Sequence, residues 1–353
     1  MKKLPLAFML AAHALVCAPA RLPAQTPKQQ TIQTTPTAPR SRHFDAVQLL
    51  RDVETLASDA MGGRKAGTPD GVKAREYVVR RFRESGLEAF AGSYLQPFTF
   101  TYPGKSDAQQ GANVVGFVRG KASKAHAARY LVVTAHYDHL GADNRGVFNG
   151  ADDNASGTAA LFALASYFAR HRPAHSVIFV ACDAEEGSGA GARKFVSEPP
   201  VDRQAIVLNV NLDMISRNER DELYAAGTYH YPFLKPYLEK IAKNAPVKLL
   251  FGHDRPDTPP AENWTTQSDH VAFHRAKIPF IYFGVEDHKD YHRPTDDFQN
   301  IHPTFYVHAV ETILDALKSF DSNLSEIEKQ KLTGSVRRAP VLESSAQTRA
   351  RGW

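Results

Sequence analysis

The sequence has 353 residues with 42% hydrophobic and 23% charged side chains, a balance that excludes a wholly disordered chain, a collagen and a coiled coil. Its two cysteines, Cys17 and Cys182, exclude a disulfide scaffold. The net charge of +5 comes from the two ends, and residues 43–322 hold 31 Lys and Arg against 35 Asp and Glu, which excludes a basic nucleic-acid-binding surface on this part.

Residues 1–24 have the pattern of a secretory signal peptide. Two lysines precede an apolar run over 4–18, and Ala18-Pro19-Ala20 supplies the small residues of a cleavage site. The run is short for a membrane anchor, and no stretch of 18 apolar residues follows it. We therefore expect a secreted or periplasmic protein without stable membrane association after cleavage. Residues 25–42, rich in Gln, Thr and Pro, indicate a disordered leader.

Helices and strands are expected to alternate through the rest of the chain. Helical spacing predicts a helix over 45–58, and the N-cap pair Thr68-Pro69 begins another that stops at Gly86. Nearly continuous apolar runs predict strands buried on both faces, over 112–118, 130–135, 176–182, 206–212 and 278–283. Further helices are expected over 156–170, 189–197, 232–244 and about 303–320.

This alternation predicts an α/β fold, with a mostly parallel twisted central sheet flanked by helices in a single domain over 43–322. A loose C-terminal tail is expected over 323–353, where the sequence is polar with scattered charge.

Acidic residues and histidines follow four of the predicted strands. They are His136-Tyr137-Asp138-His139, Asp183-Ala184-Glu185-Glu186, Asp213 and Asp290-Tyr291-His292, and Asp152-Asp153 lies just before a helix. Because open α/β sheets bind ligands beyond the carboxyl ends of their strands, we expect these side chains to meet at one edge of the sheet.

These residue types favour a catalytic metal centre. Neutral imidazoles and carboxylates suit zinc, and a donor set without cysteine is typical of a catalytic site. Two histidines, three carboxylates and a spare glutamate exceed the needs of one ion and match two ions that share a carboxylate. From composition alone, Asp152 and Asp153 are equal candidates for the shared group, and Asp153 could instead cap the following helix.

The order of the motifs resembles that of the co-catalytic di-zinc aminopeptidases, which include secreted bacterial leucine-type aminopeptidases. The resemblance covers about residues 45–320 and rests on His136-x-Asp138, GADDNASG, Glu185-Glu186, Asp213, His292, LASDAMGGRKAGTP and Ser268-Asp269-His270. It implies a zinc metallopeptidase that binds two Zn²⁺ ions and removes N-terminal residues from peptides or proteins. In this family His136 and Asp213 would hold one zinc, Glu186 and His292 the other, and Asp152 would bridge them.

The resemblance also assigns residues around the ions. Glu185 would be the general base, Tyr291 would help to polarise the scissile carbonyl, and Asp138 would accept the ring N–H of His136. A cis peptide after the bridging residue would fall between Asp152 and Asp153. The context Tyr-His-x-Pro-Thr-Asp-Asp favours His292 over its competitors His288, His270 and His274, while His139 is expected at the pocket rim. Trp264 and the Pro-rich stretch 256–260 are expected in a loop over the site.

Three other functions remain open. A glutaminyl-cyclase-like acyltransferase keeps many of these residues but uses one zinc. A carboxypeptidase would need a basic pocket, for which Arg217, Arg255 and Arg293 are the candidates. A non-catalytic binding module, as in the transferrin-receptor branch, has no reason to retain the complete ligand set and Glu185.

Overall fold

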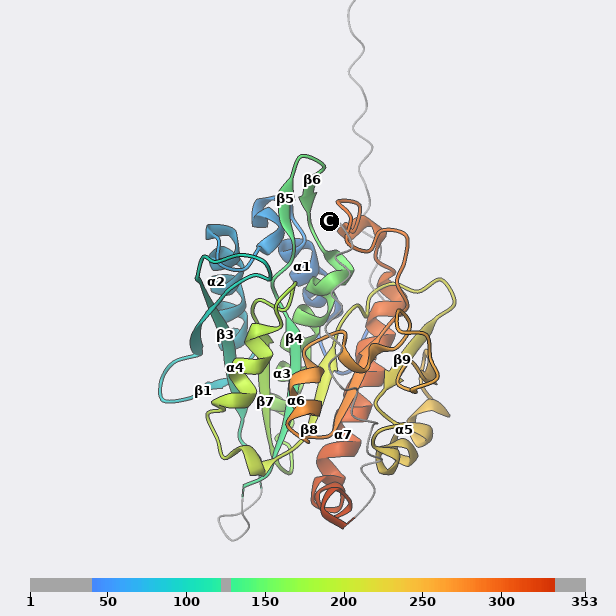
Figure 1. The fold of residues 1–353 in the computed structure, drawn as a ribbon. Coiled ribbons are helices and arrows are strands. Elements are labelled where there is room, and N and C mark those ends of the chain that lie inside the picture. The colour runs from blue at the N-terminus through green and yellow to red at the C-terminus, as the bar shows by residue number, and fades with distance from the viewer. Residues whose placement is uncertain (1–39, 122–127, 334–353) are drawn as a thin grey trace, which may run out of the picture. The chain divides into compact units, whose positions relative to one another are not determined.

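The structure, a computed structural model, describes residues 40–121 and 128–333 (Figure 1). The expected signal peptide and nearly all of the expected leader lie outside these residues, as do the last twenty residues of the chain. Among the described residues, no helix is both long enough and apolar enough to cross a membrane.

A nine-stranded sheet organises the described part of the chain. Its order is β1-β3-β7-β4-β8-β11-β9-β10, and β2 also pairs with β3. The strands are β1 (Glu88–Ala89), β2 (Leu95–Phe100), β3 (Gln109–Val118), β4 (Tyr130–His136), β7 (Ser176–Cys182), β8 (Ile206–Leu212), β9 (Glu222–Ala226), β10 (Lys248–Phe251) and β11 (Phe280–Gly284). A separate hairpin joins β5 (Gly141–Asp143) and β6 (Gly146–Phe148).

The expected α/β fold is confirmed, but the sheet is mixed. The central strands β7, β4, β8 and β11 run parallel to one another. By contrast, β3 is antiparallel to β7, and β9 is antiparallel to β11. All five predicted strands belong to the central part or to β3, whereas β1, β2, β9 and β10 were not predicted. These outer strands are two to six residues long, and their apolar runs are at most four residues, too short to predict a buried strand.

Helices cover both faces of the sheet (Figure 1). They are α1 (Ala46–Leu56), α2 (Pro69–Glu84), α3 (Gly157–Arg170), α4 (Ala190–Ser197), α5 (Lys235–Ala242), α6 (His270–Arg275) and α7 (Pro303–Thr333). Short helical turns are Asp59–Arg64, Ala151–Ser156, Arg203–Ala205, Pro232–Leu234, Trp264–Thr266 and Phe298–Asn300. Alternate residues of β4 belong to two different apolar layers. Leu131 and Val133 belong to the cluster that includes α1, α2, α3 and α7, and Val132 belongs to the cluster that includes α4 and α6.

Both helices predicted near the start of the described chain are confirmed, and so is the N-cap pair Thr68-Pro69. The Asp45 carboxylate accepts a hydrogen bond from the backbone N–H of Gln48 and begins α1. The Thr68 hydroxyl accepts one from the backbone N–H of Gly71, and Pro69 occupies the first turn of α2. Such caps satisfy N–H groups that have no partner within the helix, which fixes where each helix starts.

The C-terminal helix is longer than expected. We expected a loose tail from residue 323, but α7 continues to Thr333. Leu324 and Ile327 are completely buried and extend the apolar stripe of the helix onto the main core. The prediction was wrong because these isolated apolar residues lie among polar ones, and only the stripe that they complete shows their role.

Replacing Leu324 with alanine should therefore destabilise the protein, because the side chain is fully buried. We expect a loss of about 2–5 kcal/mol in the free energy of unfolding, measured by urea titration. Leu332→Ala is the matched control, since Leu332 lies on the same helix and is 77% exposed. Equal effects of the two substitutions would contradict a packed C-terminal extension of α7.

Candidate metal centre

The polar residues predicted at the strand ends meet at one edge of the sheet. His136 is the last residue of β4, Asp213 follows β8, and Glu186 lies four residues after β7. Because β4 runs parallel to both β7 and β8, the three strands bring their carboxyl ends to the same side. His292 reaches the same cavity from the loop between β11 and α7.

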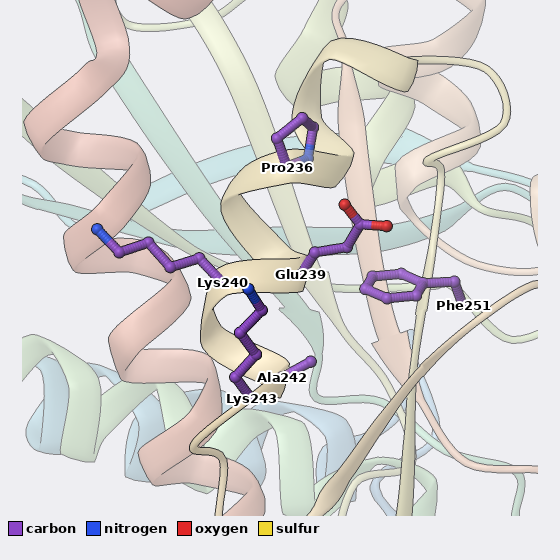
Figure 2. Close-up of a pocket in the computed structure, with 6 residues that line it drawn as sticks. All are labelled: Pro236, Glu239, Lys240, Ala242, Lys243 and Phe251. Carbon is purple, nitrogen blue, oxygen red and sulfur yellow. The ribbon is translucent and has the colours of Figure 1, made fainter.

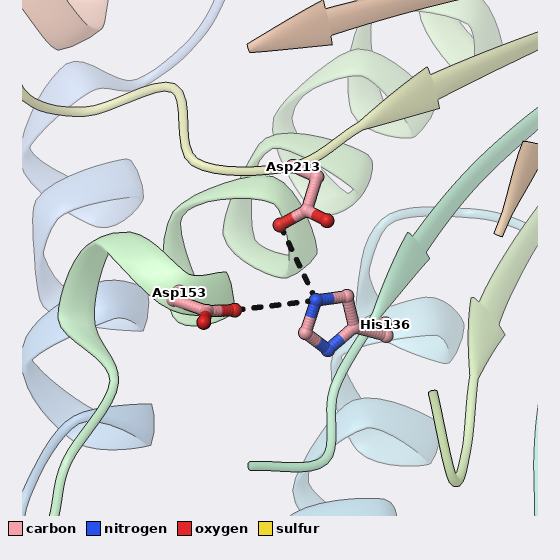
Figure 3. Close-up of side chains that lie close together, drawn as sticks. All are labelled: His136, Asp153 and Asp213. Atoms are coloured by element: carbon pink, nitrogen blue, oxygen red, sulfur yellow. Dashed lines mark hydrogen bonds and ion pairs between the residues drawn. The ribbon is translucent and has the colours of Figure 1, made fainter. Parts of the chain in front are cut away.

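A first group of donors forms around His136 (Figure 3). Its Nε2 atom lies 3.2 Å from Oδ1 of Asp213 and 3.3 Å from Oδ1 of Asp153. All three side chains are buried. The Nδ1 atom of His136 lies 3.1 Å from the backbone carbonyl of Asp138 and donates to it in the neutral tautomer that leaves Nε2 as a metal donor.

A second group lies on the other side of the Asp153 carboxylate. Its Oδ2 atom is 3.1 Å from Nε2 of His292, and that nitrogen is 3.5 Å from Oε2 of Glu186. Asp153 therefore directs one oxygen toward each of the two groups. Nitrogen and oxygen donors that converge in this way fit two zinc ions sharing a carboxylate.

Asp152 does not occupy the shared position that we expected for it. Its Oδ1 accepts hydrogen bonds from the backbone N–H and the hydroxyl of Ser216, at 2.7 and 2.8 Å. Its Oδ2 lies 3.2 Å from Nε2 of His288. The cis peptide bond lies between Asp153 and Asn154, one residue later than expected. Neighbouring side chains of this turn point to opposite sides, and it is Asp153 that faces the donors.

Asp138 supports the centre differently from our expectation. The acceptor for the His136 ring is the backbone carbonyl of Asp138, while its carboxylate lies 3.8 Å from the ring nitrogen. That carboxylate accepts hydrogen bonds from the backbone N–H groups of Glu185 and Glu186, at 3.0 and 3.2 Å. Asp138 thus ties the turn after β7 to the end of β4.

We expected His139 at the rim of the pocket, but its side chain is completely buried. Its Nδ1 lies 2.7 Å from Oε1 of Glu186, so it orients the carboxylate that faces His292. The competitors of His292 have other partners. His270 contacts the carbonyl of Trp264, at 2.8 Å, and His274 contacts the hydroxyl of Tyr231, at 2.7 Å.

Sequence comparison agrees with this geometry. Residues 113–317 match the model of Peptidase family M28. The chain belongs to this family.

The individual relatives share less than a third of their aligned residues with this chain. Aminopeptidase YwaD of Bacillus subtilis is 29% identical over 276 residues, covering 72% of this chain and 52% of the relative. The chain spans 36% of the length of another relative, a probable zinc metalloprotease of Pyrenophora tritici-repentis. The fold resembles a zinc aminopeptidase from Bacillus subtilis, with a TM-score of 0.65 and 17% identity over 80% of this chain and 96% of that one. It also resembles a glutaminyl cyclase from Bacteroides thetaiotaomicron, with a TM-score of 0.63, 20% identity and coverage of 80% and 99%.

The electrostatics of this M28 site favour cations. Burial lowers the pKa of His136, but Asp213 and Asp153 outweigh burial and raise that pKa well above its ordinary value. Burial, together with the nearby Glu186, raises the pKa of Glu185 well above its ordinary value. Burial also raises the pKa of Tyr291, so its hydroxyl remains a hydrogen-bond donor at neutral pH.

The cavity over the donors is narrow, with a volume of about 40 Å³. Its walls include Trp264, as expected, together with Met214, Gln267, Tyr282, Val285, Asp287 and Tyr291. The three arginines considered for a basic pocket are absent from its lining. Arg217 pairs with Asp290 and Arg255 with Asp257.

A wider hollow lies elsewhere, between α5 and β10 (Figure 2). It is lined by Pro236, Glu239, Lys240, Ala242, Lys243 and Phe251. A single carboxylate and two lysines do not make a divalent-metal site, so this hollow is not part of the M28 centre.

The side chain of Arg64 supports the backbone around the centre, and this role was not predicted from the sequence. Its guanidinium is completely buried and donates to the backbone carbonyls of Tyr137, Leu56, Asn149 and Gly150, at 2.5 to 3.0 Å. It therefore joins the loop after His136 to the turn that carries Asp153. The available signal was its place directly after two glycines in the segment GGRKAG, and the structure gives both glycines a positive φ.

Asp296 supports the same turn and was also not predicted from the sequence. Its carboxylate accepts hydrogen bonds from the backbone N–H groups of Asp152 and Asp153, each at 3.0 Å. Burial raises the pKa of Asp296 to about 6, and the nearby Asp152 contributes to the rise. Its position four residues after His292, in the context Pro-Thr-Asp-Asp, was the available signal.

Arg64→Met should be among the most destabilising substitutions in the chain. It removes the donors from four buried carbonyls and the positive charge beside Asp153, Asp296, Asp138 and Glu186. We expect the free energy of unfolding to fall by about 3 kcal/mol or more, measured by urea titration with a chelator present. Arg145→Met is the control, because Arg145 is exposed and contacts neighbouring Asp143 and the ring of Phe148 at the surface. A similar small change in both variants would refute the role of Arg64.

Proposed function

We propose that this M28 protein is a two-zinc aminopeptidase that hydrolyses the first peptide bond of peptides and proteins with a free N-terminus. The observation that carries the proposal is the position of Asp153, whose two carboxylate oxygens face two separate groups of donors. One catalytic ion would not need a shared carboxylate, and a structural site would not open into a cavity.

The residues that would hold the ions follow from these distances. His136 and Asp213 would bind one zinc, Glu186 and His292 the other, and Asp153 both. Bound zinc would supply a water of lowered pKa and an electrophile for the scissile carbonyl. This assignment keeps the expected ligands except for Asp152, which Asp153 replaces.

The remaining residues would handle protons. Glu185, whose pKa is raised by burial, would take a proton from the attacking water and deliver it to the leaving amine. Tyr291 stacks on His292, with ring centroids 3.9 Å apart, and lines the cavity. Its hydroxyl would donate a hydrogen bond to the carbonyl oxygen as negative charge develops there.

Several observations favour an aminopeptidase over the other functions. No Lys or Arg is among the residues that line the cavity, so a substrate carboxylate finds no basic side chain of that kind there. The relative named Aminopeptidase YwaD points the same way. A cyclase that uses one zinc would not need the second group of donors, and a binding module would not need Glu185. The N-terminal signal pattern leads us to propose secretion or export to the periplasm.

Metal content should distinguish the two neighbouring aspartates. We expect Asp153→Asn to weaken both zinc sites at once, because both lose a charged ligand, and to lower zinc affinity by more than about 100-fold. Asp152→Asn should retain more zinc, since this carboxylate contacts Ser216 and His288 instead. Zinc per chain is measured by mass spectrometry after equilibration in a zinc buffer. If Asp152→Asn loses both ions while Asp153→Asn keeps them, the assignment is wrong.

Peptide cleavage tests the function itself. The zinc-loaded protein is incubated with short peptides that have free or acetylated N-termini and free or amidated C-termini, and products are identified by mass spectrometry. We expect single residues to be lost only from free N-termini. Glu185→Gln should retain zinc but lose at least about 100-fold in turnover, because the base is removed. Trimming that requires a free C-terminus would indicate a carboxypeptidase, and cyclisation of N-terminal Gln would indicate a cyclase.

A further inference from the structure

One carboxylate in the cavity has no role in the proposed chemistry. Five acidic residues line the cavity: Asp153, Glu185, Glu186, Asp213 and Asp287. The first four are assigned as metal ligands or as the base. Asp287 lies between β11 and the metal-facing His292, on the loop that also carries Tyr291.

Asp287 stands at the mouth of the cavity, because its side chain is exposed and yet belongs to the lining. In the described part of the chain it makes no hydrogen bond or ion pair. Its neighbour Glu286 differs, since it pairs with Arg220 at 2.6 Å and does not line the cavity. Asp287 also interacts electrostatically with the centre. Partial burial and Asp153 raise its pKa, while His292 and His288 oppose the rise.

The charge of Asp287 is not needed to balance the two zinc ions of the proposed centre. Two zinc ions carry four positive charges, and Asp153, Glu185, Glu186 and Asp213 carry four negative ones. With neutral histidines, the charges of the residues that line the cavity are balanced apart from Asp287, which adds one further negative charge at the cavity mouth. A cation from the substrate would complement it, and charged hydrogen bonds of this kind are stronger than neutral ones.

We propose that Asp287 binds the α-ammonium group of the substrate and thereby restricts the enzyme to free N-termini. This inference rests on the proposed aminopeptidase function and adds a specificity residue outside the metal ligands. An acetylated N-terminus is neutral and bulkier, so it would leave the Asp287 charge unpaired in a narrow cavity. Asp287 would act on binding and orientation rather than on proton transfer.

The test compares Asp287→Asn with Glu286→Gln, which removes the same charge from the adjacent residue. The substrate is the p-nitroanilide of the residue that the wild-type protein releases fastest in the peptide panel. Two competitive inhibitors are the amide of that amino acid and its 2-hydroxy analogue, which replaces the ammonium with a neutral hydroxyl. Zinc content and thermal unfolding are measured for each variant.

We expect Asp287→Asn to raise KM and the inhibition constant of the amino amide roughly 10- to 100-fold, as for the loss of one charged hydrogen bond. The inhibition constant of the hydroxy analogue should change by less than about threefold. Zinc content and the unfolding temperature should match those of the wild type, and Glu286→Gln should behave as the wild type throughout.

The inference is overturned if both inhibitors weaken equally, if Asp287→Asn loses zinc, or if Asp287→Asn and Glu286→Gln are alike. A wild-type protein that cleaves no free N-terminus would instead overturn the proposed function on which the inference rests. These failures are distinguishable because the first three are observed in an active enzyme.

Discussion

The buried guanidinium of Arg64 is the interaction on which the arrangement of the site depends. It lies where the loop after β4 meets the turn before α3, and it donates to backbone carbonyls from both. Burial lowers its pKa to about 10, a value at which it is still charged at neutral pH. A single rigid cation therefore satisfies the polar groups of two irregular segments and opposes the carboxylates above them.

Where Arg64 donates to backbone carbonyls, buried carboxylates accept hydrogen bonds from the backbone N–H groups of the same region. Asp138 holds the turn that carries Glu185 and Glu186, and Asp296 holds the turn that carries Asp153. Each irregular segment is thus fixed by a charged side chain from a different part of the chain. The donors of the two groups can be held close together because their backbones are restrained before any ion binds.

Much of the fold and the residue types of the site could be predicted from the sequence. The buried strands β4, β7 and β8 are continuous apolar runs, and the residues that follow them had to emerge at one sheet edge. The choice between Asp152 and Asp153 could not be made in this way. It depends on how the turn is held by Arg64 and Asp296, which lie about 90 and 140 residues away in the chain. The burial of His139 depends likewise on its distant partner Glu186.

The cluster of carboxylates that suits the centre to metal ions also destabilises the fold when no ion is bound. Burial raises the pKa of Asp138, Glu185 and Asp213, and neighbouring carboxylates add to the rise for each of them. Like charges at such distances resist joint ionisation, so the metal-free centre would take up protons that bound cations displace. Metal binding would therefore release protons and add to the stability of the fold. Arg64 supplies one fixed positive charge beneath this cluster, which limits the repulsion and keeps the donors in place until cations bind.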